Sequence, residues 1–116
     1  MNKFRLDDYI VEPGNKVAKR VIFNDGQTLA FTLNIAKGEQ LPPHTHFEST
    51  VLLQVLKGEA EVLIDQKSVK AAKGDLIQID GQEEMIVNNT GQQILELYVT
   101  ISPTPPSEKY TVDANL

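Results

Sequence analysis

The chain has 116 residues, enough for one domain with its own core, and it contains no cysteine, which excludes disulfides, thiolate metal sites and cysteine nucleophiles. Its net charge of −5 argues against a nucleic-acid partner, because binding to phosphates needs a basic patch. The charged start and the absence of a long apolar segment predict a soluble cytoplasmic protein with no membrane partner.

Residues 1–16 have no regular pattern and end at Pro13-Gly14. They are expected to form an arm that lies across the domain wall or crosses to a partner subunit. From residue 17 onward, short alternating segments are separated by turn residues such as Asn24-Asp25-Gly26, which is typical of strands. The expected strands are Val17–Phe23, Thr28–Ile35, Leu41–His46, Val51–Lys57, Glu59–Ile64, Ser68–Ala72, Leu76–Ile79, Met85–Asn89 and Gln93–Ile101.

The segment Val51–Lys57 is apolar on both faces, whereas Thr28–Ile35 alternates between apolar and polar residues. A strand of a small antiparallel protein that is apolar on both faces indicates contact with another subunit. We therefore expect a homodimer that is held by strand pairing and by an outer apolar face including Leu52 and Leu56.

Residues 102–116 begin with a proline-rich stretch that cannot continue a strand, because proline lacks the backbone donor. They are predicted to be a loosely attached tail. No segment has a helical 3.6-residue period, so residues 17–101 are predicted to form an all-β sandwich or barrel of the jelly-roll type.

The only two histidines, His44 and His46, lie two residues apart after a pair of prolines. Side chains at positions i and i+2 of a strand leave the same face, so both imidazoles are expected to point to one side. Two neighbouring imidazoles form half of a site for zinc, iron, copper or nickel. The alternative is a pair of histidines on a solvated strand, since short motifs often occur by chance.

The residues around this pair resemble the first motif of the cupins, in which two histidines lie between two glycines. Gly38, His44, His46 and Gly58 occupy those positions, and Gly74 and Asn89 occupy two positions of the second motif. The resemblance is to a small single-domain cupin and covers about Val17 to Ile101. It implies a cupin double-stranded β-helix, a jelly-roll barrel of the RmlC-like kind.

The chain departs from both motifs at positions that bind metal in many cupins. Val51 stands at the position of the first motif's glutamate, and Met85 stands at the position of the second motif's histidine. The resemblance therefore carries over only His44 and His46 as metal ligands. Asp80 and Gln82 also replace the proline and glycine of the second motif.

A third metal ligand could come from nearby residues, and we leave these alternatives open. Glu48 has the right parity if the strand runs straight through His46, Glu83 or Glu84 could reach from a loop, and the Met85 thioether would favour cuprous copper. The expected cofactor is one weakly held divalent transition ion, namely zinc, iron, manganese, nickel or copper, or none. Besides the histidines, the expected lining of a small-ligand pocket is Phe31, Leu33, Val51, Leu53 and Met85.

Three functions are open at this point. The first is binding of a small organic ligand, with or without a metal ion. The second is a metal-dependent enzyme of the dioxygenase or isomerase kind, as the resemblance implies. The third is metal-free acid–base chemistry, as in sugar-nucleotide epimerases of similar fold, with a histidine base and a tyrosine acid. Tyr98 is the tyrosine nearest to the predicted barrel, but its parity in the last strand points its side chain outward. We therefore rank the third function last.

Overall fold

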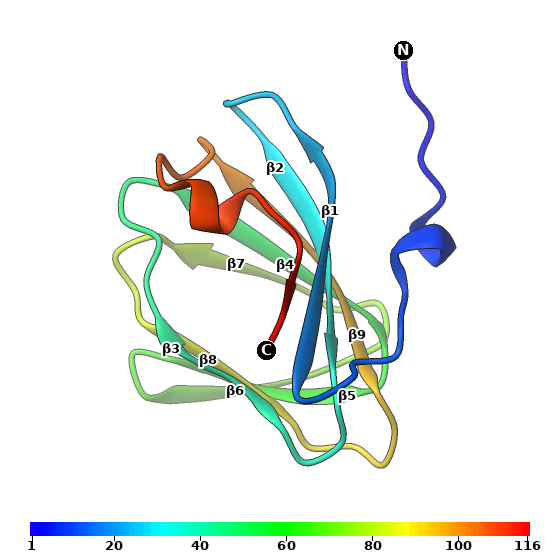
Figure 1. Ribbon diagram of the computed structural model, residues 1–116. Coiled ribbons are helices and arrows are strands. Elements are labelled where there is room, and N and C mark those ends of the chain that lie inside the picture. The colour runs from blue at the N-terminus through cyan, green and yellow to red at the C-terminus, as the bar shows by residue number, and fades with distance from the viewer.

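In the computed structural model, which describes residues 1–116, two antiparallel β-sheets face each other (Figure 1). The larger sheet has the strand order β10-β1-β2-β9-β4-β7, and the smaller sheet has the order β3-β8-β5-β6. The elements are η1 (Leu6–Tyr9), β1 (Val17–Asn24), β2 (Leu29–Ile35), β3 (Gln40–His44), β4 (Thr50–Lys57), β5 (Glu59–Ile64), β6 (Lys67–Ala72), β7 (Leu76–Asp80), β8 (Met85–Asn89), β9 (Leu95–Ser102), η2 (Glu108–Tyr110) and β10 (Ala114–Asn115).

The predicted all-β fold is confirmed, and each expected strand corresponds to one of β1 to β9. Two differences bear on the site. Strand β3 ends at His44, two residues earlier than predicted, and the chain forms an additional strand, β10, near its end. The helical elements are two short 3-10 turns, and no helix has the length and apolar character needed to cross a membrane.

The core lies between the two sheets and follows the alternation of the strands. In β9, every second residue from Leu95 to Ile101 is buried, and the residues between them are only partly buried. The buried apolar side chains of both sheets form one continuous cluster, so the sheets share a single core. Asn89 is a buried polar residue whose Nδ2 donates to Ile35 O at 3.0 Å and to Gln93 O at 2.8 Å.

Strand β2 is buried on both faces, although its sequence alternates between apolar and polar residues. The arm of residues 1–16 explains this, because Thr32 Oγ1 donates to Tyr9 O at 2.6 Å on the outer face of the sheet. Asn34 Nδ2 donates to Ala18 O at 3.4 Å on the same face. The turn η1 therefore covers the outer face of the larger sheet at β2. A crossing of the arm to a partner subunit stays a prediction.

The predicted loose attachment of residues 102–116 is wrong. Strand β10 pairs with β1, where Asn115 lies opposite Ala18 and Ala114 lies opposite Lys19. Arg20 Nη2 also donates to Asn115 Oδ1 at 2.9 Å. The prolines interrupt the ladder as expected, but the chain beyond them returns to the open edge of the larger sheet, beside β1 in Figure 1.

The outer face of β4 and β7 carries apolar side chains in contact with solvent. Leu52 is 39% exposed and Leu76 is 61% exposed. We expect two copies to associate through this face, and we expect Leu52→Glu to shift a dimer to a monomer, because a carboxylate would lose its water there. Sedimentation velocity at micromolar concentration measures this.

The matched control is Val69→Glu, which changes a side chain that is 41% exposed on β6 of the other sheet. That variant should sediment like the unmodified protein. A monomeric unmodified protein contradicts the predicted association.

Candidate functional site

The histidine pair lies where β3 leaves the smaller sheet. His44 is opposite Met85 of β8, after an irregularity in the ladder that begins at Leu41 and includes the two prolines. His46 lies in the following turn, where its backbone N–H donates to Gly81 O at 3.1 Å. The two rings are nonetheless neighbours, with centroids 4.8 Å apart in an edge-to-face arrangement.

Both histidines border a cavity of about 600 Å³ between the two sheets. The wall is mainly apolar, and its polar groups come from Lys19, His44, His46, Lys109 and Tyr110. The other lining residues are Phe31, Leu33, Leu41, Pro42, Pro43, Val51, Met85, Val99, Val112, Ala114 and Leu116.

The structure places the expected lining residues as follows. Phe31, Leu33, Val51 and Met85 border the cavity together with the histidines. Leu53 does not border it, which corrects the expected lining, because this side chain is fully buried within the core cluster. Leu53 has the same parity as Val51, but it lies one pleat further along β4.

The hydrogen bond of His44 defines its tautomer. Nδ1 lies 2.8 Å from the carbonyl oxygen of Pro42, which can only accept, so Nδ1 carries the proton and Nε2 has the free lone pair. Burial lowers the pKa of His44, and the nearby Lys19 charge lowers it further. The hydrogen bond to Pro42 partly opposes both effects.

His46 is more strongly perturbed. Burial lowers its pKa to about 4, with smaller contributions from His44 and Lys19. Its Nδ1 is buried and has no hydrogen-bond partner. The site therefore presents neutral imidazoles at pH 7, which are competent as metal ligands and as hydrogen-bond partners.

The remaining donor set is poor for a metal ion. No group of three or more histidine, cysteine or acidic side chains comes together anywhere in the structure. Glu48 is exposed in the turn after His46, where its φ of 69° shows that the strand does not run straight on. The donors are therefore two imidazoles and the Met85 thioether, which fit a weakly held ion rather than a closed four-ligand site.

The two loop glutamates, Glu83 and Glu84, lie outside the site. Glu83 Oε1 accepts a hydrogen bond from Asp80 N at 2.9 Å, and the Glu84 backbone N–H donates to Asp65 Oδ1 at 2.9 Å. Neither residue borders the cavity. The alternative in which Glu83 or Glu84 reaches the histidines is therefore not observed.

Several cavity residues had not been expected from the sequence, and two of them, Lys19 and Tyr110, bring polar groups close to other side chains of the site. The ring of Tyr110 lies 5.2 Å from that of His46, centroid to centroid, at 71°. The ammonium group of Lys19 donates to the carbonyl oxygen of Tyr110 and lies 4.6 Å from the ring centroid of Phe31. No local pattern could have identified Tyr110, because its position depends on the return of the tail to β1.

Tyr98 does not take part in the site. It lies between the buried residues Leu97 and Val99, so its side chain leaves the other face of β9, and it does not border the cavity. The outward orientation expected from its parity is confirmed.

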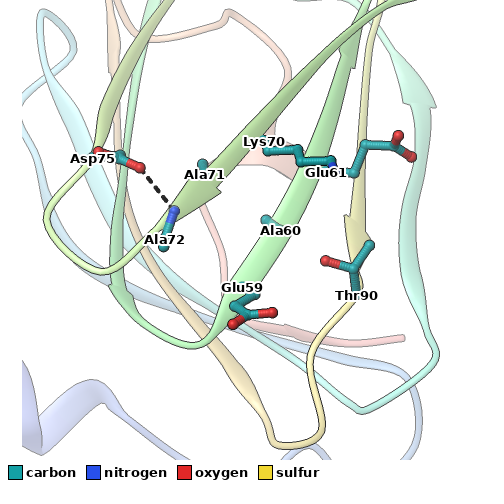
Figure 2. A pocket seen from close by; sticks show the side chains of 8 residues that line it. All are labelled: Glu59, Ala60, Glu61, Lys70, Ala71, Ala72, Asp75 and Thr90. Atoms are coloured by element: carbon teal, nitrogen blue, oxygen red, sulfur yellow. Dashed lines mark hydrogen bonds between the residues drawn. The ribbon is translucent and has the colours of Figure 1, made fainter.

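A second concavity of about 510 Å³ lies on the smaller sheet and contains none of the expected site residues. Figure 2 shows its lining side chains spread along two strands and two separate loops, with one hydrogen bond, from Ala72 N to Asp75 Oδ2 at 2.9 Å. The group has no common point toward which its side chains converge. It consists of Glu59, Ala60, Glu61, Lys70, Ala71, Ala72, Asp75 and Thr90.

Comparison with known proteins supports the architecture. Residues 31–101 match the family model described as a cupin domain. An uncharacterised protein from Methanocaldococcus jannaschii is 31% identical over 72 residues, which cover 61% of this chain and 61% of that protein. The match thus covers less than two thirds of the relative.

Solved structures resemble the whole fold. The protein TT1209 from Thermus thermophilus has a TM-score of 0.84 at 22% identity, covering 90% of this chain and 100% of that one. An RmlC-like cupin protein from Desulfovibrio desulfuricans has a TM-score of 0.78 at 20% identity, covering 89% and 97% of the two chains. At these identities the likeness concerns the fold alone.

Proposed function

Since this chain belongs to the family of cupin domains, we propose that it binds a small organic ligand in its cavity through His44 and His46, with or without one weakly held divalent metal ion. One observation carries the proposal. Two neutral imidazoles meet in a mainly apolar cavity of about 600 Å³. A concave apolar site with a few convergent polar groups is the usual form of a small-molecule site.

The histidines would act as ligands or as hydrogen-bond partners. His44 offers Nε2, because its Nδ1 is occupied by the Pro42 carbonyl, an arrangement that also orients metal-binding histidines in other proteins. A bound ion would supply Lewis acidity toward an oxygen of the ligand. Zinc, iron, nickel and copper suit imidazole nitrogen, whereas manganese prefers oxygen ligands, and cuprous copper would also accept the Met85 thioether.

A metal-dependent enzyme of the dioxygenase or isomerase kind is a weaker candidate, because such enzymes need an ion that stays bound. Metal-free acid–base chemistry gains one supporting observation, the proximity of Tyr110 to His46. A histidine with a pKa of about 4 is, however, a weak base at neutral pH. Binding is therefore the function we favour.

Metal analysis of protein purified without chelator tests the proposal beside the double variant His44→Ala/His46→Ala. We expect less than one transition ion per chain, removable by dialysis, and none in the variant. A panel of divalent ions should raise the melting temperature of the unmodified protein but not that of the double variant. Thr45→Ala, between the two histidines, is the matched control and should behave like the unmodified protein.

Three outcomes separate the candidates. One ion per chain that survives dialysis favours the metal-dependent enzyme. An absence of metal with a thermal response to organic ligands favours a binder without metal. If neither metal ions nor organic ligands change the melting temperature, the proposed binding function is contradicted.

A further inference from the structure

Lys19 brings a positive charge into the apolar cavity. Its ammonium group donates to one carbonyl oxygen, that of Tyr110, and lies 4.6 Å from the ring centroid of Phe31. An ammonium group has three donors, so two are free for a ligand. Lys19 is partly buried, so its amine has lost part of its water. This burial lowers the pKa of Lys19, while the charge of Asp113 favours the protonated form.

The charge of the cavity is opposite to that of the protein. The chain contains 16 acidic residues and has a net charge of −5, yet no aspartate or glutamate borders the cavity. Its formal charges belong to Lys19 and Lys109. Asp113 is the carboxylate whose charge acts on the pKa of Lys19. Its Oδ1 accepts a hydrogen bond from the backbone N–H of Val21 at 2.6 Å.

A partly desolvated ammonium without a paired carboxylate is unfavourable unless an anion joins it. We propose that the ligand of this cavity is a small organic monoanion, whose carboxylate is held by Lys19 and whose apolar body lies against Phe31, Leu33 and Val99. The inference rests on the proposed ligand-binding function and adds the chemical class of the ligand.

The polar groups favour a carboxylate over the other charged classes. A cationic ligand would be repelled by Lys19 and by Lys109, and the cavity offers it no carboxylate. A phosphate dianion carries more charge than Lys19 can match, because Lys109 is exposed and solvent screens its charge. A monoanion leaves the rest of the ligand free to cover the apolar wall, which provides most of the cavity surface.

Calorimetric titration with matched compounds tests the proposal. The probes are 3-phenylpropanoate, 3-phenylpropanol, 3-phenylpropylammonium and inorganic phosphate, and octanoate with octanol repeats the comparison on a linear body. We expect the acids to bind at least 10-fold more tightly than the alcohols, because charge-assisted hydrogen bonds are stronger than neutral ones. The ammonium compound and inorganic phosphate should not bind.

The variant Lys19→Met keeps the apolar stem and removes the charge. It should weaken acid binding by about 10- to 100-fold and leave alcohol binding unchanged within about 2-fold. Lys67→Met, an exposed lysine of β6, is the matched control and should bind the acids like the unmodified protein. Unchanged alcohol binding in Lys19→Met also shows that the variant is folded.

The outcomes distinguish this inference from the proposed function. If alcohols bind as tightly as acids, or if Lys19→Met keeps full affinity for acids, the cavity is a ligand site but the anion assignment is wrong. Preferential binding of phosphate or of the ammonium compound also overturns it. If none of the compounds binds at millimolar concentration, the anion assignment fails, and the metal-ion panel then decides the proposed function separately.

Discussion

Gly81→Ala is expected to lower the free energy of unfolding by about 3 kcal/mol and to displace His46. The added methyl group would overlap backbone atoms, which cannot move aside without a shift of the whole turn. A Cβ atom at this position would overlap the carbonyl oxygens of His46 and Ser49 and lie 2.9 Å from Ser49 N. All three are backbone atoms, so rotation of a side chain cannot remove the overlap. The turn that holds His46 would have to move.

Urea denaturation measures the loss of stability, and the imidazole proton signals of the chain's two histidines report the displacement. Gly14→Ala is the matched control, since its Cβ would meet nothing within 4 Å and its φ is not positive. That variant should change neither observable. Equal stability of the two variants would contradict the predicted packing of Gly81 against the histidine turn.

Acid is expected to destabilise the metal-free protein between pH 6.5 and pH 4, before general acid unfolding. The unfolded chain protonates its histidines near pH 6.5, whereas burial holds the pKa of His46 in the folded state at about 4 and lowers that of His44. The unfolded state therefore binds more protons in this window, and stability falls as the pH falls. Above pH 6.5 both rings are neutral in the folded and the unfolded state, so the stability no longer depends on their protonation.

We expect a loss of about 2 kcal/mol, below the full conversion at about 1.36 kcal/mol per pKa unit, because solvent in contact with the part-exposed rings screens the effect. Urea denaturation at a series of pH values after chelator treatment measures it. The double variant His44→Gln/His46→Gln, which cannot titrate here, should lose less stability over the same range. Parallel pH profiles of the two proteins would contradict the prediction.

Much of the fold could be predicted from the sequence because the strands carry their own signals. The alternation from Leu95 to Ile101 and the turn at Asn24-Asp25-Gly26 identify strands and their ends without long-range information. The burial of Thr32 could not be predicted in this way. It depends on Tyr9, a residue of an arm that has no regular pattern.

The site was only partly accessible to sequence reasoning. The motif places His44 and His46 together, and the structure keeps them together although His46 lies beyond the end of β3. The position of Glu48 depends on a turn with positive φ, which strand parity does not reveal. Lys19 and Tyr110 meet through a pairing between distant parts of the chain, so neither has a local signal.

Composition also gave expectations that the fold does not address. Cytoplasmic location and the lack of a nucleic-acid partner follow from charge and sequence pattern alone, and they stay predictions.

The pairing of β10 with β1 has a consequence for colloidal behaviour. Without that short strand, β1 would be the bare edge of the larger sheet, with the apolar run Val21-Ile22-Phe23 near its end. Bare edges with apolar side chains invite growth of the sheet from one molecule into the next, and thereby fibril formation. The last residues of the chain cover this edge at Ala18, Lys19 and the backbone N–H of Val21, so we expect them to oppose polymerisation, and they also close a wall of the cavity.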